Sequence, residues 1–195
     1  MKSYNGLAKS LGATTQEVAK SADTWLRQGY SVADTNQLIT STMYLAKLGQ
    51  IESGQASQYL TSMLKGFKLE ASDAMSVVDK LVALDKEYAV TAGGVAEALS
   101  RTAVSAQMAG VELDKIAALG TVVTDVSQKS SDSVGESFKT MFARYGNVKA
   151  GVFEDLTDSS GETTENINDI EKVLNQVGIK VRDSNYEFRE MDSVL

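Results

Sequence analysis

Proline is absent from all 195 residues of this chain. An average soluble chain of this length holds roughly ten prolines. Because proline removes a backbone donor and clashes with the preceding helical turn, its absence leaves long helices uninterrupted. Aromatic residues make up only 7% of the chain, and alanine supplies much of its apolar share, which favours closely packed helices over a thick sheet-built interior. The sequence therefore predicts an all-α fold.

Glycine marks most of the predicted corners between helices. Several of these glycines are followed within two positions by an apolar residue, and then by Ser or Glu, which can open the next helix. A glycine in the left-handed conformation ends a helix, and the apolar residue after it folds back onto the last turn. We therefore expect a multi-helix bundle of short antiparallel helical hairpins. The glycine corners are expected at Gly12, Gly29, Gly49, Gly66, Gly110 and Gly146.

The most regular stretch runs from Thr91 to Gln128 and predicts two amphipathic helices joined at Gly110. Val111 is expected to fold back onto the end of the first helix. No group in this stretch does obvious chemistry, so it is interpreted as a packing unit. Its inward residues are expected to be Val95, Leu99, Thr102, Ala103 and Ala106 in the first helix, and Leu113, Ile116, Gly120 and Val123 in the second.

Capping residues locate the other helices. Thr14 and Glu17 form a capping-box pattern at the start of a helix that is expected to run to about Gln28. Ser31 is the expected N-cap of the next helix, which runs to Leu48. Further helices are expected over residues 51–65, 72–84 and 133–145, the last of them stopped by Gly146.

The pattern changes after residue 150 and divides the chain into two parts. Residues 1–150 are expected to form a helical domain of about seven short helices. Residues 151–195 are expected to hold a polar linker, an amphipathic helix over 164–177, a small β-hairpin near 179–188 and the first turn of a truncated helix. Because the chain stops inside that last pattern, it is interpreted as a fragment of a longer protein.

Charge is concentrated in the second part. Residues 1–151 hold 15 basic and 15 acidic residues, whereas residues 152–195 hold 4 basic and 11 acidic ones. Nucleic-acid binding is not evident, because a nucleic-acid binder is expected to carry a basic stripe and this chain has none. The acidic segment is interpreted as solvated surface and loop.

The composition also argues against several kinds of chemistry. The chain has no Cys and no His, so it lacks disulfides, thiolates, the commonest general base and the commonest neutral metal ligand. Its first residues lack the apolar core of a secretory signal, and no stretch reaches 18 uninterrupted apolar residues. Neither a membrane segment nor a cofactor is expected.

Four groups of residues could suggest a site, and each has a plainer interpretation. Gly93-Gly94 could form a phosphate cradle, but no complete phosphate-binding motif surrounds it, so helix-entry packing is favoured. The pairs Asp79/Asp85 and Glu112/Asp114 could imitate the two carboxylates of a hydrolase, yet they lie where amphipathic helices carry solvated charges.

The other two candidates fail on spacing and on position. Asp155, Asp158 and Glu162 do not match the ligand spacing of a calcium loop. Trp25, the only tryptophan, could anchor a ligand, but at a helical position beside Leu26 it is more often part of a core. The residues therefore indicate a helical scaffold with no catalytic, cofactor-binding or metal-binding residues.

Three runs of the chain carry a family resemblance. The run Val90–Gly151 places an Ala-rich helix before a Gly turn, a second helix rich in Ala and Leu, and then Ser and Gly near the start of a helix with Phe and Arg. The run Val173–Leu195 contains Gly-Ile, Val-Arg-Asp, a turn, Phe-Arg and Met in order, and Ser10–Thr35 is similar to the region just upstream. Together, these runs resemble the core region of phage tail tape measure proteins.

The resemblance implies a structural role in a phage or prophage tail. Such a protein runs through the tail lumen, its length sets the tail length, and it leaves ahead of the DNA at infection. The implied partners are the tail-tube protein and tail assembly chaperones, with self-association also expected. The implied location is the virion tail lumen, and the host bacterial cytoplasm during assembly. The alternative from the residues alone is an independent helical binding or pore-forming module.

Overall fold

The computed structural model describes residues 4–150, with side chains through 145, and then residues 176, 178, 180–184, 187 and 189. The part of the chain that it describes is helical, which confirms the predicted all-α fold. Its elements in chain order are α1 (Tyr4–Leu11), α2 (Thr15–Arg27), α3 (Val32–Leu48), α4 (Ser53–Gly66), the short 3-10 turn η1 (Ala71–Asp73), α5 (Ala74–Glu87), α6 (Ala92–Met108), α7 (Leu113–Ser127) and α8 (Ser131–Ala150).

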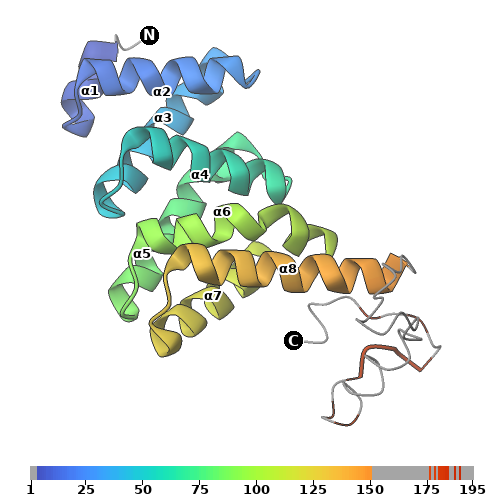
Figure 1. Cartoon of the computed structure of the whole chain (residues 1–195). Helices are drawn as coiled ribbons and strands as arrows, with labels where there is room; N and C mark the ends of the chain where they lie inside the picture. Colours follow the sequence, from blue (N-terminus) through green and yellow to red (C-terminus); the bar gives the residue numbers. More distant parts are fainter. Residues whose placement is uncertain are drawn as a thin grey trace, which may run out of the picture.

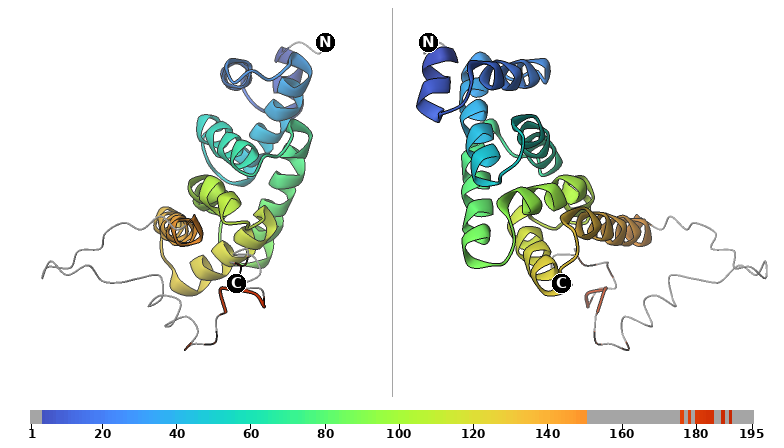
Figure 2. Two further views of the ribbon diagram at one scale, coloured as in Figure 1. Left: turned by 90° about the vertical axis from the view of Figure 1, so that its right-hand side faces the viewer. Right: turned by 60° about the vertical axis from the view of Figure 1, so that its left-hand side comes forward.

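The helices form two layers. In the even layer, α2, α4, α6 and α8 lie side by side in that order (Figure 1). In the odd layer, α3 and α5 follow one another along the long axis of the molecule, and α7 lies at the lower end (Figure 2). The most extensive contact is that between α6 and α8, followed by that between α4 and α6. The result is an elongated stack in which the core runs between the two layers.

Neighbouring helices of the even layer run parallel, because successive positions along one helix contact successive positions along the next in the same chain direction. Ser21 of α2 lies 3.5 Å from Ser57 of α4 between their hydroxyl oxygens, and Gln28, just after α2, donates from its amide to the hydroxyl of Thr61 at 3.2 Å. Further along the stack, Gly66 at the end of α4 lies against Ala103, and the pairs Gly94/Ser131 and Ala98/Gly135 join α6 to α8. An odd helix therefore returns the chain between each parallel pair.

This arrangement is a structural repeat. The even helices begin at residues 15, 53, 92 and 131, which are 38 or 39 residues apart, and α5 and α7 begin at 74 and 113, again 39 residues apart. The residue four positions after each even-layer cap is buried and apolar: Val18, Ala56, Val95 and Val134. Stacking of such two-helix units buries a face that one unit could not bury alone.

Several helix ends follow the predicted glycine stop. Gly12, Gly29 and Gly110 have φ values of +57°, +89° and +78°. At Gly110 the N–H of Val111 reaches the carbonyl of Ala106 at 2.9 Å, and Val111 is buried. This is the backbone pairing of the Schellman stop.

Two predicted glycine stops are wrong in detail. After α3 the left-handed residue is Gln50 (φ +53°), not Gly49, and after α4 it is Lys68 (φ +56°), not Gly66. Both glycines instead lie where another helix approaches closely, since a Cβ on Gly49 would stand 2.8 Å from the backbone nitrogen of Gly93. Glycine occurs at these corners because another helix leaves no room for a side chain. The positive φ falls one residue after Gly49 and two residues after Gly66.

The structure corrects two further expectations. The predicted stop at Gly146 is wrong, because α8 continues to Ala150. No helix is expected before Gly12 from the sequence, whereas α1 occupies Tyr4–Leu11 and packs on α2 and α3. An eight-residue helix has too weak a pattern by itself to be separated from a loop, and its tertiary contacts stabilise it.

Part of the expected hairpin falls on described residues. The N–H of Asp183 donates to the carbonyl of Glu187, and the N–H of Arg189 donates to that of Val181, both at 2.9 Å. This register is that of an antiparallel hairpin, although no regular strand forms in the part of the chain that is described. The predicted linker at 155–161, most of the predicted helix at 164–177 and the predicted turn at 191–195 lie outside the described residues.

Candidate functional site

Gly93-Gly94 lies at the first turn of α6, in contact with the corner between α3 and α4. The hydroxyl of Thr91 accepts the N–H of Gly94 at 3.0 Å and so caps the helix. A Cβ added to Gly93 would stand 2.7 Å from the Cγ2 atom of Ile51. The space in front of this helix start is therefore filled by protein, which supports the packing interpretation.

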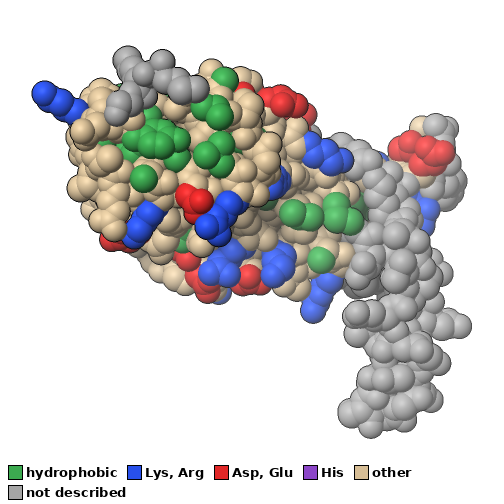
Figure 3. Space-filling view, turned by 90° about the horizontal axis from the view of Figure 1, so that it is seen from above, with side chains coloured by type: hydrophobic (Ala, Val, Ile, Leu, Met, Phe, Trp, Pro, Cys, Tyr) green, Lys and Arg blue, Asp and Glu red, His purple; other side chains and the backbone are tan. Residues whose placement is uncertain are grey.

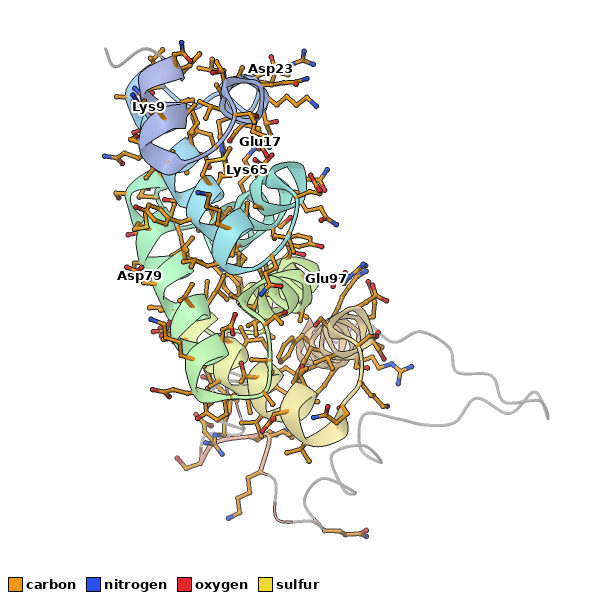
Figure 4. All side chains as sticks on the ribbon, turned by 90° about the vertical axis from the view of Figure 1, so that its left-hand side faces the viewer. Lys9, Glu17, Asp23, Lys65, Asp79 and Glu97 are labelled. Atoms are coloured by element: carbon orange, nitrogen blue, oxygen red, sulfur yellow. The ribbon has the colours of Figure 1, made fainter. Side chains whose placement is uncertain are left out.

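The candidate carboxylates have separate surroundings. Asp79 is exposed on the outer side of α5 (Figure 4). The labelled acidic residue of α6, Glu97, lies on the other side of the molecule. Asp85 accepts the N–H of Ala92 at 2.8 Å, which ties the end of α5 to the start of α6. Asp114 forms an ion pair with Lys80 at 2.5 Å between α7 and α5. These contacts stabilise helix junctions. Glu112 is the exposed N-cap residue of α7.

The remaining sequence candidates fall in the core or outside the described range. Trp25 is fully buried, and its Nε1 donates to the Thr42 hydroxyl at 3.1 Å, which joins α2 to α3. Its ring meets Tyr30 edge-on with 5.5 Å between centroids, and burial raises the pKa of the Tyr30 hydroxyl. The proposed calcium-loop residues lie outside the described residues. Within the described residues, no three His, Cys, Asp or Glu side chains are placed to hold a metal ion.

An ion cluster connects α6 to α8 and was not found from the sequence. The guanidinium of Arg101 pairs with Asp132, with Glu136 at 3.3 Å and with Glu97 at 3.6 Å. A hydrogen bond from Lys139 and the charge of that lysine, and then the hydrogen bond and charge of Arg101, lower the pKa of the Glu136 carboxyl. Because these groups are exposed, each pair contributes little stability, but together they favour one register of α8 on α6. Asp132 and Glu136 lie 31 and 35 residues from Arg101 in the sequence, so no local pattern reveals that they pair with it.

An open groove of about 530 Å³ lies between α1, α3 and the η1–α5 corner. Its lining is neutral and includes Leu7, Asn36, Gln37, Thr40, Ser72 and Met75. Seen from the α1–α2 end, Lys and Arg side chains are interspersed with Asp and Glu (Figure 3). The groove offers hydrogen bonds to a neutral surface, with no charged centre for catalysis.

Exposed apolar side chains gather on three helices of the described part. These are Val32, Tyr44 and Leu48 on α3, Val104 and Met108 on α6, and Val122, Val123 and Val126 on α7. The prediction that Val123 faces inward is therefore wrong, because its side chain is on the outer side of α7. No helix among the described residues is both long enough and apolar enough to cross a membrane. The arrangement therefore offers contact surfaces on a stack of helices.

Comparison with known proteins adds one match. A family model described as phage-related minor tail protein matches residues 5–195. The matched range includes nearly the whole helical stack and continues to the last residue of the chain. No solved structure matches the chain.

Proposed function

We propose a role in tail-length control for this chain, which belongs to the phage-related minor tail protein family. The family makes the chain a component of the virion tail, places it in the context of tail assembly and points to a non-enzymatic protein. Our proposal is narrower. The chain is a segment of a tape measure protein, which sets tail length and takes part in assembly and genome ejection.

The observation that carries this proposal is the linear repeat. A stack built from units of about 39 residues grows in one direction, and most of its contacts join neighbouring units. Such a design changes length by a fixed step when a unit is added or removed. That property suits a ruler and has no obvious use in a compact binding domain.

The partners and location follow from the same proposal. The tail-tube protein would polymerise around the chain, assembly chaperones would hold it beforehand, and copies of the chain would associate with each other. Assembly would take place in the host cytoplasm, with the mature protein in the tail lumen.

The test is deletion of one repeat in the full-length parent protein. Removal of residues 53–91 joins the cap Glu52 directly to α6, so that one even-helix start replaces another. The deleted unit contributes about 58 Å to the length of the protein if it forms one extended helix, and about 10 Å if it stays folded within the stack. Electron microscopy of virions should show tails shortened by one of these two steps.

A duplication of residues 53–91 is the matched control and should lengthen tails by the same step. Tails of unchanged length in both variants would refute the ruler proposal. Leakage of dye from liposomes on addition of the purified chain would instead favour the alternative, an independent pore-forming module.

A further inference from the structure

The stack of helices meets a different kind of structure at the end where α7 lies. There the N–H of Asp183 donates to the carbonyl of Glu187, and the N–H of Arg189 donates to the carbonyl of Val181. These residues lie near α7 in two views of the molecule (Figure 2). The described residues 180–184, 187 and 189 are called the closing hairpin below.

Hydrogen bonds fix the closing hairpin on α8. The Tyr145 hydroxyl of α8 donates to the backbone carbonyl of Arg189. The backbone N–H of Arg189 donates to the carbonyl of Val181, and its Nη1 donates to the carbonyl of Lys180 at 3.0 Å. Arg189 therefore joins both sides of the hairpin to one another and to the last even helix.

The closing hairpin has one apolar side chain in the core and a polar outer surface. Val181 is 3% exposed and belongs to the same core as Phe142 and Tyr145 of α8. It is the one buried residue among the described residues of the hairpin. Its exposed residues are Lys180, Asp183, Ser184 and Glu187. A polar outer surface of this kind is what the terminal element of a repeat stack needs.

Comparison of the repeats shows why α8 needs a cover at this point. Because α8 begins 39 residues after α6, Phe142 and Tyr145 occupy the positions of Ala103 and Ala106. All four side chains are buried, but the two aromatic rings carry far more apolar surface than two methyl groups. In the even layer α6 has α4 and α8 as neighbours, whereas among the described residues α8 has α6 alone. The carbonyl of Arg189 covers the phenol of Tyr145 where no further helix does.

We infer that the closing hairpin is an end cap that prevents a second copy of the chain from stacking on α8. A second copy is the natural competitor, because the units of this stack already pack on one another through even helices. An uncovered end with Phe142 and Tyr145 would be an apolar patch of the kind that marks an association site. With the hairpin in place, the end presents charged and polar side chains, and copies of the chain must associate through other surfaces. This role is independent of the proposed tail-length function.

Val181 is the position at which the cap can be opened selectively. An unpaired carboxylate in an apolar core is strongly unfavourable, so Val181→Asp should release the hairpin from α8. The other units keep their contacts with their neighbours, because most contacts in such a stack are between adjacent units. The variant should therefore retain its helices and lose its end cap.

Sedimentation velocity of the full chain over a range of concentrations tests the cap. Val181→Asp should self-associate about tenfold more tightly or more than the matched control Ser184→Asp, which adds the same charge at an exposed position of the same hairpin. Equal association of the two variants would overturn the inference. Loss of helical circular dichroism in Val181→Asp would overturn it as well, since the hairpin would then be required for the fold of the whole stack.

Hydrogen exchange in the full chain tests the link to α8 without placing a charge in the core. Tyr145→Phe keeps the ring and removes the hydroxyl that donates to Arg189. The amide of Arg189 should then exchange about tenfold faster or more, while the amides of α6 keep their rates. Tyr44→Phe, at an exposed tyrosine of α3, is the control. An Arg189 amide that exchanged equally fast in both variants would show that α8 does not hold the hairpin, and the inference would fail.

Discussion

Replacement of Gly135 by alanine should destabilise the protein, although the same change at Gly120 should stabilise it. Both glycines lie inside helices, Gly135 in α8 and Gly120 in α7. Alanine is favoured over glycine in a helix interior by about 1 kcal/mol, so the propensity gain is shared by the two variants. Only the surroundings of the added methyl group differ.

Those surroundings are opposite. A Cβ on Gly135 would stand 2.9 Å from the carbonyl oxygen and 3.0 Å from the Cα atom of Ala98, both of them backbone atoms of α6 that cannot move alone. A Cβ on Gly120 meets no atom within 4 Å. Overpacking at a tight contact costs about 1–3 kcal/mol, which exceeds the propensity gain at Gly135. The expected net changes are a loss of about 1 kcal/mol for Gly135→Ala and a gain of about 1 kcal/mol for Gly120→Ala.

Urea and thermal unfolding followed by circular dichroism measure both variants. A change of 1 kcal/mol corresponds to about 2–4 °C in the midpoint for a chain of this size, so the two midpoints should differ by about 4–8 °C. If Gly135→Ala proved as stable as Gly120→Ala, the close parallel contact between α6 and α8 would be refuted.

Further variants test three separate features. Gly110→Val should lower the free energy of unfolding by about 1–2 kcal/mol, because a β-branched residue tolerates φ +78° poorly. Gln50→Gly should raise it by up to about 1 kcal/mol, because Gln50 has a positive φ that glycine adopts without strain. An unchanged melting curve for Gly110→Val would mean that this turn does not constrain the helix end. Trp25→Phe should lose about 2 kcal/mol in urea unfolding, since it removes the donor to Thr42 and leaves that hydroxyl buried, and a loss no larger than that of Leu26→Ala at the exposed neighbouring site would contradict this. Glu17→Gln should cost about 0.5 kcal/mol at pH 7, because hydrogen bonds from the backbone N–H and then the hydroxyl of Thr14 lower the pKa of the Glu17 carboxyl. A lowered folded-state pKa contributes stability above the unfolded value and loses it as pH falls, so the difference from wild type should close below pH 4.5, and a difference that persisted at pH 3 would exclude the carboxylate as its cause.

Local chemistry explains why most of the helices could be predicted. The capping box at Thr14 and Glu17 forms as the sequence predicts, and Ser31 caps α3 by accepting the N–H of Asp34 at 3.1 Å. The stop at Gly110 also forms as predicted. Each of these signals involves residues at most five positions apart, so the sequence contains the whole interaction. The absence of proline predicts the helical fold class for the same reason.

Predictions about candidate sites depended on contacts that a sequence does not display. The sequence correctly placed Trp25 in the core, yet the hydroxyl that accepts its N–H comes from Thr42 on another helix. The ion cluster around Arg101 joins it to residues 31 and 35 positions away, and no pattern in either helix points to the other. A surface of this kind becomes visible only when the helices are packed.

What the sequence determined by itself is therefore the set of helices and most of their ends, because caps and stops are short-range. The tertiary structure alone decided that the even helices run parallel at a spacing of 38 or 39 residues, and that Gly49 and Gly66 serve close approach while Gln50 and Lys68 make the turns. Only the tertiary structure shows that α8 continues through Gly146 to Ala150, since glycine permits a helix end without requiring one. The physical reason is range: a neighbour about 37 residues away competes with local preference, and only the packed structure shows which of them prevails.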